Sequence, residues 1–182
     1  MALEILVKNK RCSKEKILRE YPDAAIIDVT SKGEGEWRKL SPFFPHGGIP
    51  VPFTERATSM SVEGIWQGLK VFETTDVDRS SFRNDTMKGL KRTGRKNGKC
   101  LGHRKGISGD ELLGYIEARK MIYVPSYYWM LENKCKDQVD KIRTMAESRT
   151  VVLLDYDTND DIENPNKPLS HASLIRNYIQ KN

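Results

Sequence analysis

Apolar residues recur at helical spacing in the segment SMSVEGIWQGLKVF, residues 59–72. Four of them stand at i, i+3, i+4 and i+7, the spacing of one buried helix face: Val62, Ile65, Trp66 and Leu69. Glu63, Gln67 and Lys70 occupy a neighbouring polar stripe. The pattern predicts a helix that begins near Ser61, and it leaves open whether the polar stripe faces solvent or lines a pocket.

Other patterns along the chain predict further helices and strands. Helices are expected at 13–21, 109–121, 126–147 and 170–180, with a weaker helical pattern at 80–93, and strands at 24–31 and 150–156. Ser13 is the expected N-cap of the first helix, and Pro22 ends it. The prolines and glycines of LSPFFPHGGIPVPFT predict an ordered loop with short extended pieces.

This order of elements shows no clean alternation of helices and strands, and it predicts an α+β fold. We expect one compact, mainly helical domain with a few short strands. Its main part would span 38–182, with 1–37 packed on it as a helix–strand extension.

Composition narrows the class of protein. The chain has 182 residues, 37% hydrophobic and 31% charged, which is typical of a globular protein. It contains no apolar run of about 18 residues, so no membrane span is expected. The N-terminal residues have no cleavage-site pattern, and Cys12, Cys100 and Cys135 lack zinc spacing, so free thiols and a cytoplasmic location are expected. The three histidines are equally scattered, and no metal is expected.

Charge is distributed unevenly along the chain, whose formal net charge is +6. Residues 88–105 carry eight Lys or Arg side chains and no acid, whereas 153–163 is acidic. The glycines of the basic segment lack the spacing of the known nucleotide-binding loops. Three interpretations stay open: a phosphate cradle in which Arg92, Arg95 and Lys96 supply charge, a footprint on a nucleic-acid backbone, or a solvated loop.

Two stretches, LSPFFPHGGIPV and SVEGIWQGLKVF, resemble the opening of the NADAR superfamily, the NAD- and ADP-ribose-associated N-glycosidase domains. That family opens with a Phe-Ser-Asn-Phe-Tyr-Pro-like stretch, followed by Ser-Val-Glu-His-Tyr-Tyr-Gln-Ala-Gln-Lys-Phe. The second signature is matched by Ser61, Val62, Glu63, Gln67 and Lys70, with Trp66 in an aromatic position. KGLKRTGR resembles the family's Ala-Lys-x-Leu-Gly-Arg turn, and VVLLDYDTNDD with KPLSHASLIRNY resembles its last strand, acidic loop and closing helix.

The chain also departs from the family pattern. Gly64 and Ile65 stand where the family has histidine and an aromatic residue, and IENPNKP replaces its Trp-Gly-x-Gly stretch. The resemblance spans about residues 38–180, and it identifies a divergent member.

The resemblance implies a hydrolase that cleaves the bond between a ribose C1′ and a nitrogen. The substrate would be of ADP-ribose type or another phosphorylated ribosyl compound, with ADP-ribosylated guanine in nucleic acid as one example. Glu63 would stabilise the oxocarbenium-like transition state and activate water. From the residues alone, Glu63 could instead act only as a first-turn carboxylate that favours the helix. No metal or redox cofactor is required.

The remaining candidate residues take roles implied by the same resemblance. The expected catalytic acids besides Glu63 are Asp155 and Asp157, whose spacing excludes a calcium loop. The expected substrate-binding residues are Phe43, Phe44 and Trp66 as walls, Gln67 on sugar hydroxyls, Lys70, Arg92, Arg95 and Lys96 on phosphates, and His171. Capping or packing is the alternative for His171. The alternative function is a non-catalytic binder that sequesters a nucleotide, or docks on nucleic acid or a protein through residues 88–105.

Overall fold

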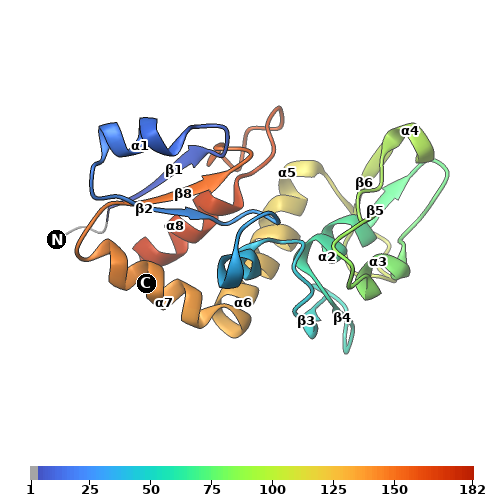
Figure 1. The fold of residues 1–182 in the computed structure, drawn as a ribbon. Coiled ribbons are helices and arrows are strands. Elements are labelled where there is room, and N and C mark those ends of the chain that lie inside the picture. Colours follow the sequence, from blue (N-terminus) through green and yellow to red (C-terminus); the bar gives the residue numbers. More distant parts are fainter. Residues whose placement is uncertain (1–3) are drawn as a thin grey trace. The chain divides into compact units, whose positions relative to one another are not determined.

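A computed structural model describes residues 4–182, which form two compact units (Figure 1). The terminal unit combines the residues up to Ser41 with Leu131–Asn182, and the central unit is Pro42–Met130. This division differs from the expected boundary between 37 and 38, because an N-terminal and a C-terminal part of the chain share one sheet. The chain enters the central unit after Ser41 and leaves it within helix α6 (Val124–Lys134).

Three parallel strands form the sheet of the terminal unit, in the order β1 (Ile5–Asn9), β8 (Val151–Asp155) and β2 (Ala25–Asp28). Val151 pairs with Ile5 on one side and with Ala25 on the other. Parallel strands cannot be joined by a tight turn, so helix α1 (Lys14–Glu20) makes the crossover from β1 to β2.

Helices cover both faces of this sheet (Figure 1). Ile17 of α1 packs against Val152 and Leu154, whereas Leu153 points to the opposite face, where α7 and α8 lie. All five residues of β8 are buried as a result. The remaining helical elements of the terminal unit are the 3₁₀-helix η1 (Gly35–Leu40), α7 (Lys136–Ala146) and α8 (His171–Lys181).

The central unit contains two small antiparallel sheets. Its strands are β3 (Ile49–Pro50) paired with β4 (Thr58–Ser59), and β5 (Lys70–Phe72), β6 (Cys100–Arg104) and β7 (Leu112–Leu113) in that order. Its helices are α2 (Val62–Gly68), α3 (Arg79–Arg83), α4 (Gly94–Asn97), α5 (Tyr115–Ala118), the π-helix η2 (Arg119–Tyr123) and the first part of α6.

Two glycines let α2 lie close to α3. A Cβ atom on Gly64 would stand 2.7 Å from the carbonyl oxygen of Ser81, and one on Gly68 would stand 2.5 Å from the ring of Phe82. Real Cβ atoms essentially never make contacts this short, so a larger residue at either position would force its neighbours to shift. Packing therefore accounts for Gly64, one of the residues that differ from the NADAR signature.

The predicted elements with strong local signals are confirmed. The helix at Ser61, the first helix after Ser13 and the closing helix after Ser170 all begin where expected, and each serine side chain caps its helix by accepting a backbone N–H. The predicted strands at 24–31 and 150–156 correspond to β2 and β8. The mixture of helices and small sheets confirms the α+β class.

Other predictions about elements were wrong. Residues 109–121 do not form one helix, because Leu112–Leu113 pair with β6 and only then does α5 begin. The expected helix at 126–147 is interrupted at Cys135, whose thiol donates to the carbonyl oxygen of Lys39 at 3.3 Å. Within 80–93, only α3 is helical up to Arg83. Strands β1, β5 and β6 were not predicted. Lys70, which was expected on the polar stripe of the helix, instead begins β5, because α2 ends at Gly68 and the chain then pairs with β6.

Across residues 4–182, no helix combines the length and the apolar character needed to cross a membrane.

Candidate functional site

The first turn of α2 holds the carboxylate of Glu63 inside the central unit. Ser61 begins the helix, with its Oγ accepting the Gly64 N–H at 2.9 Å. The Glu63 backbone N–H donates to the carbonyl oxygen of Pro42 at 2.8 Å, which fixes the start of the helix against the preceding loop. The residue is only 7% exposed. A carboxylate at this point also gains from the partial positive charge of the helix N-terminus.

Gln67 lies one turn further along α2 and donates to Glu63. Its Nε2 lies 2.7 Å from Glu63 Oε1, and its Oε1 accepts the backbone N–H of Arg92 at 2.9 Å. Because Arg92 occupies the oxygen end of the amide, the NH₂ end is directed at the carboxylate. The pair Glu63–Gln67 is thus buried, hydrogen-bonded and fixed in orientation.

The side chain of Arg92 acts as a clamp within the central unit. Nη1 donates to the carbonyl oxygens of Gln67 and Lys70 at 2.9 and 2.6 Å. Nη2 donates to Thr75 Oγ1 and to the Asp76 carbonyl oxygen at 3.0 and 2.7 Å. Every terminal nitrogen of this guanidinium therefore holds protein groups, which differs from the expected role of Arg92 as a phosphate ligand.

Lys70 begins β5 directly after α2 and is half-buried. Burial lowers the pKa of its ammonium, and the nearby Glu63 carboxylate acts in the opposite direction. The positive charges of Arg92 and Lys91 add to the lowering. A carboxylate and an ammonium are thus close enough in the central unit to influence one another.

His103 is a site residue that the sequence analysis missed. It lies on β6 opposite Lys70, is 2% exposed, and its ring contacts that of Trp66 at a tilt of 32°, with 3.8 Å between ring centroids. Burial first, and then the charges of Lys70 and Arg92, lower its pKa to about 3. Within residues 4–182 neither ring nitrogen makes a hydrogen bond of good geometry, and the effect of the nearby Trp66 backbone, which raises the pKa, is outweighed by burial. The imidazole is therefore neutral over the physiological pH range.

Tyr115, whose ring lies near that of Trp66, and Arg119, which contacts Tyr115, were not predicted either. Arg119 is 2% exposed and donates to the Tyr115 hydroxyl at 2.8 Å. Its Cζ atom lies 4.3 Å from the centroid of the Tyr115 ring, a cation–π contact. The Tyr115 and Trp66 ring centroids are 6.0 Å apart. These residues were missed because 109–121 was expected to be a plain helix, and because β6, which carries His103, has the sequence CLGHR, which shows no strand periodicity.

The remaining predicted residues of the central unit lie in less enclosed positions. Phe43 and Phe44 are half-buried, and the Phe44 ring lies 4.7 Å from that of His46. Arg95 and Lys96 are exposed. Lys96 lines a hollow of 530 Å³, to which Arg92 also contributes.

The other three predicted residues belong to the terminal unit. Asp155 ends β8 and is 4% exposed. Its carboxylate accepts hydrogen bonds from the Tyr156 and Ala172 backbone N–H groups and from the Ser170 hydroxyl, and lies 3.1 Å from His171 Nδ1. These contacts join the end of β8 to the start of α8, so Asp155 and His171 have a structural role in the fold. Asp157 is half-buried.

The contact of His171 with Val29 completes this arrangement. His171 Nε2 lies 2.8 Å from the Val29 carbonyl oxygen, which links α8 to the end of β2. The structure thus brings Asp155 and His171 together, and it separately brings Glu63, Gln67, Lys70 and Arg92 together in the central unit.

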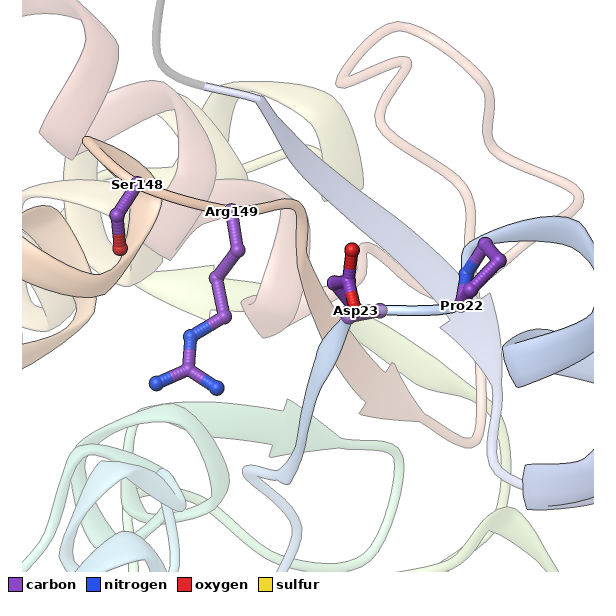
Figure 2. Close-up of a pocket in the computed structure, with 5 residues that line it drawn as sticks. Pro22, Asp23, Ser148 and Arg149 are labelled. Carbon is purple, nitrogen blue, oxygen red and sulfur yellow. The ribbon is translucent and has the colours of Figure 1, made fainter.

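A second hollow, of 510 Å³, lies in the terminal unit before the starts of β2 and β8 (Figure 2). Pro22, Asp23, Ala24, Ser148 and Arg149 line it. Figure 2 shows the Asp23 carboxylate directed away from the Arg149 guanidinium. No candidate residue from the sequence analysis lies here, and in residues 4–182 no group of three or more His, Cys, Asp or Glu side chains could hold a metal ion.

Fold and site together define an α+β protein whose central unit brings a buried carboxylate, amide and imidazole together with a half-buried ammonium. The chain belongs to the DUF6939 family, described as a family of unknown function, which matches residues 9–175. No curated protein matches the chain.

Proposed function

We propose that the protein is an N-glycosidase-like hydrolase that cleaves the bond between a ribose C1′ and a nitrogen. Its substrate is an ADP-ribose-type or other phosphorylated ribosyl compound. In the part of the chain that the structure describes, none of the three cysteines forms a disulfide, which is compatible with a reducing compartment, and we include a cytoplasmic location in the proposal.

The observation that carries this proposal is the buried, hydrogen-bonded carboxylate of Glu63 at the start of α2. Cleavage of a glycosidic bond develops positive charge on the ribose ring. A carboxylate about 4 Å from that charge contributes roughly 4 kcal/mol at an effective dielectric constant of about 20. This energy corresponds to roughly a thousandfold in rate. The same oxygens can accept a proton from the attacking water.

The neighbours of Glu63 support the same chemistry. Gln67 fixes the carboxylate, which saves reorganisation when charge develops. Lys70 supplies an ammonium for the phosphate or the ribose hydroxyls. The Trp66 ring, which is held against the ring of His103, offers an apolar wall. Because His103 is neutral, it adds no positive charge that would oppose a ribosyl cation.

The test is turnover by the wild-type protein and by Glu63→Gln, which keeps the size of the side chain and an oxygen that can accept from Gln67. NAD, ADP-ribose conjugates and an ADP-ribosylated oligonucleotide are incubated with each protein, and released base is measured by mass spectrometry. We expect loss of about a thousandfold in the variant. Glu55→Gln, an exposed carboxylate of the same unit, is the matched control and should retain turnover.

Two results would overturn the proposal. One is the absence of base release from every substrate by the wild-type protein. The other is equal turnover by the wild type and Glu63→Gln.

The second candidate function is a non-catalytic binder, favoured by the exposed cations of 88–105. Five of them have no hydrogen-bond or ion-pair partner for their side chains among residues 4–182: Lys88, Lys91, Arg95, Lys96 and Lys99. Cations without partners are the feature expected of a surface that meets phosphates. Tight binding of nucleotide or nucleic acid without any product would support this candidate.

A further inference from the structure

The hollow of the central unit has the size of a ligand site. Its volume of 530 Å³ falls within the range of roughly 300–1,000 Å³ found for small-molecule sites. Three stretches of the chain line it: Thr75–Asp78, Gly89 with Lys91–Thr93, and Lys96 with Asn97. The hollow lies beside the Arg92 clamp, so one wall of it is fixed by hydrogen bonds.

The two acids of the hollow are already satisfied by protein groups. Arg104 donates twice to Asp76, at 3.0 and 2.8 Å, and this contact lowers the pKa of Asp76. Burial raises the pKa of Asp78, but hydrogen bonds from Ser80 and Ser81 outweigh it and the net shift is downward. Both carboxylates are therefore ionised and engaged.

The cations of the hollow are not all satisfied. Arg92 is bound to protein oxygens, but the ammonium groups of Lys91 and Lys96 are exposed and make no hydrogen bond or ion pair within the described residues. The lining carries the cations Lys91, Arg92 and Lys96 and the carboxylates of Asp76 and Asp78, and Arg104 already neutralises Asp76. Positive charge therefore exceeds negative charge around the hollow. The chemistry that completes such a site is an anion with several acceptor oxygens.

We propose that this hollow binds the phosphate groups of a small nucleotide through the ammonium groups of Lys91 and Lys96. Two hydrogen bonds link the site to Glu63: the Arg92 backbone N–H donates to Gln67, and the Gln67 amide donates to Glu63. This inference deepens the proposed function and rests on it for the identity of the ligand. It also replaces Arg92 with Lys91 as a phosphate ligand.

A compact ligand fits the hollow better than a continuous nucleic-acid backbone. Asp76 is 63% exposed at its side chain and lies in the lining. A polynucleotide that crosses this region would place successive phosphates beside an ionised carboxylate, whereas one or two phosphates can lie between the lysines alone.

The test compares two double variants that remove the same charge from the same segment. Lys91→Gln with Lys96→Gln removes both proposed ligands, and Lys88→Gln with Lys99→Gln removes two exposed cations that do not line the hollow. Inorganic pyrophosphate and ADP-ribose are titrated into each protein by calorimetry. We expect the first pair to weaken binding of both probes by about ten- to a hundredfold, since each charge-assisted contact contributes up to about a factor of ten. The control pair should bind within about threefold of wild type.

If the two double variants weakened probe binding equally, the cations would form a diffuse surface and the proposed site would be overturned. Tighter binding of an oligonucleotide than of both probes would overturn it too. Absence of pyrophosphate binding to the wild type would overturn it as well. Pyrophosphate has no glycosidic bond, so its binding is independent of the hydrolase chemistry. If pyrophosphate binds as expected but Glu63→Gln retains turnover, only the hydrolase proposal fails; if the lysine pair has no effect but Glu63→Gln loses turnover, only this site fails.

Discussion

At the residue scale, the presentation of Glu63 depends on an amide with two different ends. The Gln67 side chain could turn either its oxygen or its NH₂ group toward the carboxylate. The backbone N–H of Arg92 removes that freedom, because it binds the oxygen at 2.9 Å. A buried acceptor then faces a donor and not another acceptor, which avoids the cost of an unmade hydrogen bond. One backbone group 25 residues away along the chain therefore fixes the polar partner of the candidate catalytic residue.

The buried imidazole of His103 should make the free energy of unfolding depend on pH. In the unfolded chain its pKa returns to about 6.5, whereas burial holds the folded value at about 3. Between these values the unfolded state binds more protons than the folded state, so stability is present above pH 6.5 and is lost as the pH falls toward 3. Between pH 7 and pH 5 the expected loss of unfolding free energy is about 2 kcal/mol. Urea unfolding at the two pH values measures it.

His103→Gln is the variant that isolates this effect, because glutamine does not titrate. Between pH 7 and pH 5 its unfolding free energy should fall by about 2 kcal/mol less than that of the wild type, whatever its absolute stability. The ion-paired Asp76 has a lowered pKa, so it stays ionised across this window and does not obscure the comparison. An equal loss in wild type and variant would contradict the assigned burial of a neutral imidazole.

At the element scale, the structure separates what local sequence can specify from what it cannot. The start of α2 was predictable because Ser61, the apolar stripe and the first-turn carboxylate all lie within a few residues. Strand β6 was not, because its strand character comes from pairing with β5 and β7 and not from its own sequence CLGHR. The same long-range pairing converts 112–113 from expected helix to strand. His103 and Tyr115 were missed for this reason alone.

The close packing of α2 on α3 leads to a prediction about Gly68. Alanine there would place Cβ 2.5 Å from the Phe82 ring, and we expect the overpacking to lower the free energy of unfolding by about 1–3 kcal/mol. Gly94→Ala in α4 is the matched control, since no atom of residues 4–182 beyond the adjoining backbone lies within 4 Å of its Cβ position. The control should be neutral or stabilising by up to about 1 kcal/mol. Chemical denaturation of both variants checks this; equal effects would mean that α2 and α3 are not in close contact.

At the scale of the whole molecule, the candidate residues fall into two groups that serve different purposes. The resemblance predicted that Glu63 and Asp155 are both catalytic acids of one site, but it did not predict which groups each carboxylate contacts. Asp155 is occupied in joining β8 to α8, a role set by packing in the terminal unit. Glu63 lies near Gln67, Lys70 and Arg92 in the central unit. A motif predicts which residues matter more readily than it predicts what they do.

The charge of the whole molecule provides the test of the second candidate function. With a net charge of +6 and exposed cations concentrated in 88–105, a nucleic-acid surface would release one counterion for each phosphate it neutralises. The logarithm of the association constant with duplex DNA should then fall linearly with the logarithm of salt concentration, with a slope of about −0.9 per phosphate contact. Arg95→Gln with Lys96→Gln should make that slope less steep by about 2. Fluorescence anisotropy at several salt concentrations measures both slopes. Parallel slopes for wild type and variant would show that these side chains meet no phosphates, and the docking surface would lose its support.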